Sequence, residues 1–140
     1  MANRELIEKK LRNIAEYIGE LEPILKIDNQ EIQLDKTKLR TVERLLQLIV
    51  DTAVDINEHI ISEKKLVTAD DYQSTFTVLG EKGILPDIFA RKIAPSVGLR
   101  NAVVHQYEKI DLDKMLDAVR SNIGDYREYV RLIGKFLKKA

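Results

Sequence analysis

The sequence lacks cysteine and tryptophan altogether, and these absences narrow what the protein can do. Without cysteine the chain has no disulfide, no thiolate metal site and no cysteine nucleophile. Aromatic residues make up only 6% of the chain, so platforms for stacking nucleobases are scarce. Proline and glycine are also few, with three and six residues, which favours long regular elements over loops.

An excess of one charge is missing as well, because 23 Lys and Arg residues balance 23 Asp and Glu residues. Proteins that bind long nucleic acids non-specifically usually carry a basic excess, so any attraction for RNA must be local. No apolar run approaches the roughly 20 residues that cross a bilayer, and the charged first residues have no apolar signal core. The sequence therefore predicts a soluble cytoplasmic protein, and its 140 residues suit one domain, 1–140.

Apolar residues recur at steps of three and four, the spacing of helices with one buried face. These stripes predict long helices over about residues 7–25, 37–61 and 111–137. The mixed polar stretch 27–34 fits either a loop or an interrupted helix. No segment alternates like a strand, and no Asn-Gly or Asp-Gly hairpin turn occurs. We expect an all-α bundle of three long helices with a short helical insert.

The insert has its own start and stop signals. Thr68 is placed to cap a short helix, with Asp71 at the reciprocal acidic position of a capping box. A second short helix is expected to open at Pro86 and to break at Pro95 and Gly98. The apolar sides of the two short helices are predicted to be formed by Tyr72, Phe76 and Leu79, and by Ile88, Phe89, Ile93 and Val97.

Only two histidines are present, and they lie in different settings. His59 sits among polar residues of the second long helix and is interpreted as a surface or boundary residue. No cysteine and no His-x-x-x-His pair accompany the histidines, so we expect no metal site. His105 instead follows Arg100 and Asn101 and precedes Tyr107. If a helix runs through this stretch, Asn101 and His105 share a face one turn apart.

Arg100 would be offset from His105 by about 140°, but its long side chain could reach the same pocket. Such a cluster suits metal-free cleavage of RNA, in which the 2′-hydroxyl attacks the adjacent phosphorus. A histidine moves protons near neutral pH, and an arginine holds the phosphate oxygens. One histidine cannot easily be both base and acid, which favours a symmetric dimer. The residues alone leave a structural role open, because histidines near helix ends often stabilise the terminus.

The stretch Gly98 to Tyr107 resembles the signature of the HepT family of HEPN domains. That signature is an Arg, four residues, a His, one residue and a Tyr, usually with Asn after the Arg, and every position is matched here. Further family-like features follow the family's order and extend the resemblance from about residue 1 to residue 137. They are the segment 43–47, the aromatic pair Tyr72 and Phe76, and the dipeptide Ile110-Asp111.

The resemblance implies an all-α HEPN-type bundle of four to five up-down helices, often dimeric, with the Arg and His of both subunits facing one cleft. It also implies a metal-independent endoribonuclease toxin, for which no cofactor is expected. The implied partner is an MNT-type nucleotidyltransferase antitoxin that neutralises the toxin by adenylylation of the motif tyrosine. Carried over by position, Arg100 and His105 are catalytic, Asn101 supports them, and Tyr107 is the modification site.

Two other classes of function stay open at this level. The chain could be a non-catalytic HEPN module that binds a nucleotidyltransferase partner or a nucleotide, or a structural dimer held by Arg100 and His105. Asp51 and Asp55 share a face of the second long helix and could orient Arg100 across the bundle. Solvated surface carboxylates are the commoner case, and we expect that role for both and for Glu58.

Overall fold

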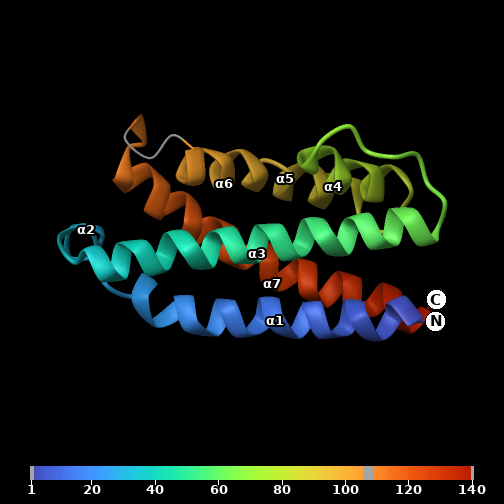
Figure 1. The fold of residues 1–140 in the computed structure, drawn as a ribbon, viewed down its shortest axis with the longest axis horizontal. Coiled ribbons are helices and arrows are strands. Elements are labelled where there is room, and N and C mark those ends of the chain that lie inside the picture. Colours follow the sequence, from blue (N-terminus) through green and yellow to red (C-terminus); the bar gives the residue numbers. More distant parts are fainter. Residues whose placement is uncertain (1, 106–108, 140) are drawn as a thin grey trace.

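Three long helices form the frame of the protein, whose computed structural model describes residues 2–105 and 109–139. They are α1 (Ala2–Leu25), α3 (Lys36–Glu63) and α7 (Leu112–Lys139). Figure 1 shows that α3 and α7 both run opposite to α1, and that a return pass connects α3 to α7, so that the two termini lie at the same end. The described residues contain no strand, which confirms the expected all-α, up-down fold.

Four short helices complete the architecture: α2 (Asn29–Leu34), α4 (Tyr72–Glu81), α5 (Asp87–Ile93) and α6 (Ser96–His105). The last three follow one another along the same side of α3 and together make the return pass between α3 and α7 (Figure 1). Within the described ranges, no helix is both long and apolar enough to cross a membrane.

The apolar stripes predicted from the sequence are buried where the long helices meet. Burying one large aliphatic side chain is worth about 1.5–3 kcal/mol, so these stripes dominate the stability of the bundle. Residues exposed by at most 1% come from all three long helices and the insert, and include Ile7, Ile14, Leu21, Val42, Ile49, Ile56, Phe76, Leu79, Leu116, Val119 and Ile133.

The insert begins later than the sequence predicted, because Asp71 and not Thr68 caps α4. The Asp71 carboxylate accepts a hydrogen bond of 2.7 Å from the backbone N–H of Ser74, and the helix starts at Tyr72. Two residues expected on apolar faces are instead exposed, Tyr72 by 50% and Ile88 by 78%. For Tyr72 the reason is its place at the first residue of α4, since the buried residues of this helix begin at Thr75.

Prolines mark helix ends with small shifts from the prediction. Pro23 lies in the last turn of α1, and Pro86 is the residue before α5 and not its first position. The chain breaks between α5 and α6 at Pro95, as expected, but the predicted break at Gly98 is wrong because this glycine lies inside α6. Arg100 and His105 therefore belong to one continuous helix.

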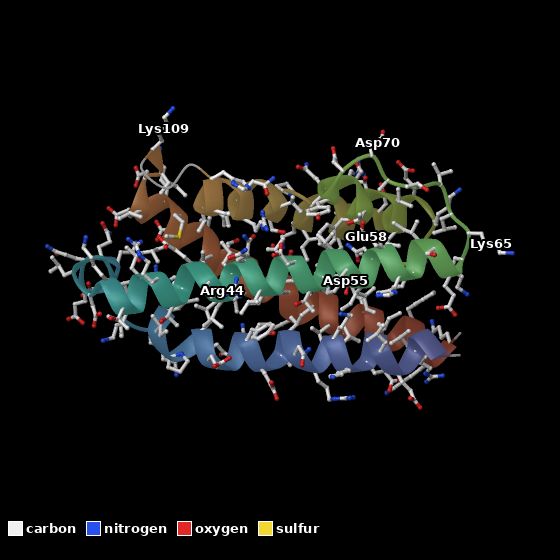
Figure 2. All side chains as sticks on the ribbon, in the orientation of Figure 1. Arg44, Asp55, Glu58, Lys65, Asp70 and Lys109 are labelled. Atoms are coloured by element: carbon white, nitrogen blue, oxygen red, sulfur yellow. The ribbon has the colours of Figure 1, made fainter. Side chains whose placement is uncertain are left out.

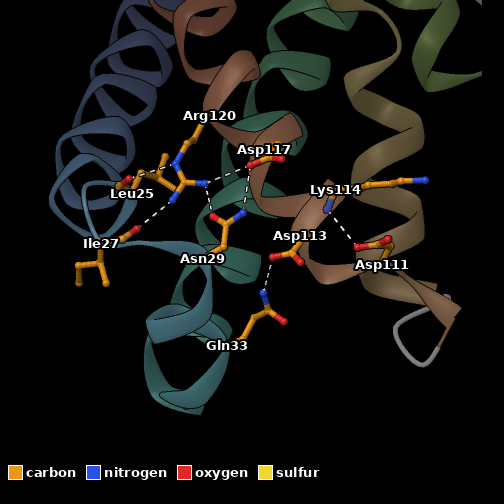
Figure 3. A network of polar contacts seen from close by, with 9 residues as sticks. All are labelled: Leu25, Ile27, Asn29, Gln33, Asp111, Asp113, Lys114, Asp117 and Arg120. Atoms are coloured by element: carbon orange, nitrogen blue, oxygen red, sulfur yellow. Dashed lines mark hydrogen bonds and ion pairs between the residues drawn. The ribbon is translucent and has the colours of Figure 1, made fainter.

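The stretch that the sequence left open, 27–34, contains α2 and ties the turn after α1 to the start of α7 (Figure 3). Arg120 of α7 donates hydrogen bonds of 3.1 and 2.9 Å to the carbonyl oxygens of Leu25 and Ile27. These carbonyls belong to the last residue of α1 and to the turn after it, where no further helical turn supplies N–H donors. Side-chain amides complete the network, with Asn29 donating to Asp117 at 3.0 Å and Gln33 donating to Asp113 at 2.7 Å.

Replacing Gly80 with alanine is expected to destabilise the protein by about 1–3 kcal/mol through overpacking. A Cβ atom at Gly80 would lie 2.6 Å from the Cβ of Ala90, so α4 and α5 would have to separate. The matched control is Gly134→Ala, where a new Cβ meets nothing within 4 Å and better helix propensity should add roughly 0.5–1 kcal/mol. Urea unfolding of both variants checks this, and an equal effect at the two positions would contradict the packing argument.

Candidate active site

The candidate site is carried by α6, whose other face is fixed to the bundle. Val97 and Val103 are buried, and Ser96 shares a 2.6 Å hydrogen bond with the hydroxyl of Tyr126 on α7. Burial raises the pKa of Tyr126 far above its usual value, so this phenol remains a neutral structural group. With one side of α6 held in this way, the opposite side presents the polar residues of the predicted motif.

Arg100 crosses from α6 to α3, where Asp51 holds its guanidinium. The Nε donates to Oδ1 of Asp51 at 2.9 Å, and Nη2 donates to Oδ2 at 3.2 Å. The arginine side chain is only 15% exposed, whereas that of Asp51 is 38% exposed. A two-point pair of this kind fixes the plane of the guanidinium as well as its position. The expectation that Asp51 is simply solvated is wrong, and its alternative, orientation of Arg100 across the bundle, is correct.

Asn101 contacts the third nitrogen of the guanidinium, Nη1. Its side-chain oxygen accepts a hydrogen bond of 3.2 Å from Nη1 of Arg100. A guanidinium has five N–H donors, and three are engaged by Asp51 and Asn101. Two donors, one on Nη1 and one on Nη2, therefore have no partner among the described residues and can serve an anionic ligand.

His105 lies at the end of α6 with an exposed imidazole. No described residue forms a hydrogen bond or an ion pair with its ring, so its nitrogens are available to a ligand. His105, Arg100 and Asn101 line one cavity of about 570 Å³, as the helical spacing predicted. The other lining residues are Val97 of α6 and three residues where α4 begins, namely Asp71, Tyr72 and Gln73.

Those three residues at the start of α4 were not expected at the site. The sequence indicated a capping acid and an apolar aromatic, and nothing in it placed residues 71–73 opposite His105. A pattern confined to one element does not reveal which other element faces it. Tyr107, the predicted modification site, lies outside the described residues.

Asp55 and Glu58, the other two carboxylates considered on α3, do not pair with Arg100. Asp55 pairs with Lys10 of α1, with 2.6 Å between Nζ and Oδ2, and the His59 ring lies 3.7 Å from its other oxygen. Glu58 is exposed on the same helix, and Figure 2 shows Asp55 and Glu58 on neighbouring turns of α3. His59 is 31% exposed, which confirms its interpretation as a boundary residue. Only Asp51 among these carboxylates contacts the candidate site.

The ribonuclease HepT-like family model matches residues 14–133 of the chain. A tRNA nuclease HepT from Aphanizomenon flos-aquae is 36% identical over 132 residues, which cover 94% of this chain and 90% of that protein. An mRNA nuclease HepT from Shewanella oneidensis is 24% identical, with coverage of 92% and 96%.

Solved structures agree with the fold. The tri-AMPylated Shewanella oneidensis HEPN toxin, in complex with its MNT antitoxin, superposes with a TM-score of 0.84 at 24% identity, covering 92% of this chain and 96% of the toxin. A toxin–antitoxin complex with AMP-PNP gives a TM-score of 0.86 at 23% identity, with coverage of 94% and 98%. These likenesses confirm the HEPN-type fold expected from the motif.

Substituting Asp51 with asparagine is expected to release the guanidinium of Arg100, because a neutral amide offers one acceptor where the carboxylate offers two. The Nε–H resonance of Arg100 in ¹H–¹⁵N spectra should then broaden and exchange faster with solvent. Asp55→Asn serves as the matched control, since Asp55 lies one turn away and pairs with Lys10. An Arg100 signal that is equally sharp in wild type and Asp51→Asn would show that the ion pair does not order this side chain.

Proposed function

The chain belongs to the ribonuclease HepT-like family, and from this membership we propose that it is a metal-independent endoribonuclease toxin controlled by an MNT-type nucleotidyltransferase antitoxin. The observation that carries the proposal is the cavity that Arg100, Asn101 and His105 line together. It brings together two guanidinium donors and an imidazole that have no partner among the described residues, in one place where a phosphodiester could bind. The cytoplasm is the compartment where such a protein would meet cellular RNA.

The proposed reaction assigns one role to each residue. His105 takes the proton from the 2′-hydroxyl, whose oxygen attacks the adjacent phosphorus and displaces the 5′-oxygen of the next nucleotide, leaving a 2′,3′-cyclic phosphate. Arg100 donates its two free N–H groups to the non-bridging oxygens, where negative charge builds. Asn101 and Asp51 touch Arg100 and fix its orientation, so they are positioning residues.

The leaving 5′-oxygen needs a proton, and the described part of one subunit offers a single histidine in this cavity. We therefore propose a homodimer in which two copies of α6 face one cleft, so that the second His105 supplies the acid. A two-fold axis beside the cleft would bring the two rings together without any further catalytic residue.

The proposed partner acts on Tyr107. A relative with a similar fold is an AMPylated HEPN toxin bound to an MNT antitoxin, which supports this form of control here. An adenylyl group on Tyr107 would add a bulky, negatively charged nucleotide two residues from His105. It would fill the approach to the cavity and repel an RNA phosphate. Among RNA classes, tRNA is the first substrate to test, because the relative at 36% identity is a tRNA nuclease.

Replacing His105 with alanine is expected to lower the cleavage rate about 10²- to 10⁴-fold, since proton transfer contributes that much to catalysis. Arg100→Lys should also lose most activity, because an ammonium cannot reproduce the planar pair of donors. The assay uses partner-free protein on tRNA and mRNA with EDTA present, and Asp55→Asn serves as the folded control. Full activity of His105→Ala, or loss of wild-type activity in EDTA, would overturn the mechanism, and a folded wild type that cleaves no RNA would favour a binding module.

Tyr107→Phe toxin is expected to resist neutralisation by the nucleotidyltransferase, because it lacks the hydroxyl that would accept AMP. Mass spectrometry after incubation with the partner and ATP should show AMP adducts on wild type and none on Tyr107→Phe. Tyr72→Phe provides the control, since Tyr72 is an exposed tyrosine that lines the cavity, and this variant should still be modified. Full neutralisation of Tyr107→Phe with no adduct would separate inhibition from adenylylation.

A further inference from the structure

We propose that Tyr72 is the stacking platform for an unpaired nucleobase of the RNA, next to the phosphate held by Arg100. This inference rests on the proposed function and adds a recognition site to it. It identifies the ligand as the base of a single-stranded nucleotide, and it places that base at the start of α4, opposite the catalytic residues of α6.

The exposure of Tyr72 is the first observation that supports this site. Tyr72 is 50% exposed, and every other aromatic residue in the described ranges is half-buried or buried. Phe76, Tyr126 and Tyr129 are fully buried. The Tyr72 hydroxyl has no hydrogen-bond partner among the described residues, so the ring is not held by a structural contact at its tip. In a chain with so few aromatic residues, an exposed ring beside the candidate active site calls for a ligand.

The location of Tyr72 is the second observation. Tyr72 lines the same cavity as Arg100, Asn101 and His105, although it is the first residue of α4 and those three belong to α6. Figure 1 shows α4 and α6 on the same side of α3, joined by α5. A cavity of about 570 Å³ has room for one nucleotide, since ligand pockets typically measure about 300–1,000 Å³.

The charges around the cavity determine how a bound nucleotide is oriented, with its phosphate toward one helix and its base toward the other. Arg100 lies on the α6 side, where its two free donors attract a phosphate. On the α4 side, the hydrogen bonds that Asp71 accepts from Ser74 keep the pKa of this carboxyl below its usual value, so it is ionised at neutral pH and repels a phosphate. The sugar–phosphate backbone therefore follows α6, and the base extends toward α4, where the Tyr72 ring offers a neutral flat surface.

Stacking of this kind requires a base with a free face. A base inside a duplex has both faces covered by its neighbours, so the platform selects unpaired nucleotides such as those of loops. Because every base has a π-face, Tyr72 would position the strand for cleavage without choosing one base over the others. The platform would thus select RNA by its structure and not by its sequence.

The first test compares Tyr72→Phe with Tyr72→Leu on a loop-containing RNA. Phenylalanine keeps the ring and should retain kcat/KM within about twofold. Leucine removes it and should lower kcat/KM about 5- to 150-fold, mainly through KM, given the usual strength of base–aromatic stacking. Ile88→Ala is the matched control, because Ile88 is an exposed apolar residue of α5 that does not line the cavity. Equal activity of Tyr72→Leu and wild type would overturn the proposal.

An abasic scan of the RNA makes the test specific. Removing the stacked base should lower kcat/KM of the wild type as much as the Tyr72→Leu substitution does. The same abasic RNA should not lower kcat/KM of Tyr72→Leu any further. Two independent, additive losses would overturn the proposal. The alternative role for Tyr72 is a contact between subunits, and light scattering tests it by measuring the mass of each variant in solution. A Tyr72→Leu protein that loses its dimer would assign Tyr72 to the subunit interface and overturn the proposal.

Photo-crosslinking separates this inference from the proposed nuclease activity. His105→Ala protein bound to 5-bromouridine RNA should crosslink at Tyr72, and Tyr72→Leu in the same background should not. If Tyr72 crosslinks but the wild-type protein cleaves no RNA, the base-stacking site is supported and the proposed nuclease activity is overturned. If the wild-type protein cleaves RNA but crosslinks form only outside residues 71–73, the nuclease activity is supported and the base-stacking site is overturned.

Discussion

The ion pair between Arg100 and Asp51 is the contact on which the rest of the site depends. It joins α6 to α3 through two hydrogen bonds in one plane, and the arginine is too well covered to swing freely. A partly buried guanidinium without a carboxylate would lose much of its hydration without compensation. The pair therefore sets the direction in which the remaining donors of Arg100 point, and with it the place proposed for a phosphate.

This arrangement needs a rigid support, and the buried face of α6 supplies it. The hydrogen bond between Ser96 and Tyr126 anchors the beginning of the helix to α7, while Val97 and Val103 pack into the core. One face of a short helix is thus fixed by packing, and the other presents Arg100, Asn101 and His105 to the cavity. A regular helix is enough to present three chemically different groups to one cavity, provided that its register does not change at Gly98.

The side of the cavity formed by the start of α4 carries the opposite charge to the side formed by α6. Residues of α4 face those of α6, so that an ionised carboxylate and an exposed tyrosine ring lie opposite an arginine and a histidine. Neutral overall composition is compatible with RNA chemistry when charges of opposite sign are separated across one cavity. Under the proposed function the attraction for a phosphate is local, as the balanced composition requires, and the acidic side would orient the nucleotide.

The sequence by itself determined the helical class, the three long buried stripes and the motif from Arg100 to Tyr107, because each of these depends on spacing within one element. Resemblance to a family added roles for those residues. Only the tertiary structure decided that Asp51 and not Asp55 holds Arg100, and that Tyr72 faces the cavity instead of the core. One turn of helix separates the two aspartates, so local periodicity treats them alike. Contacts between elements distant in sequence depend on how the helices cross, and no pattern within a single helix specifies that crossing.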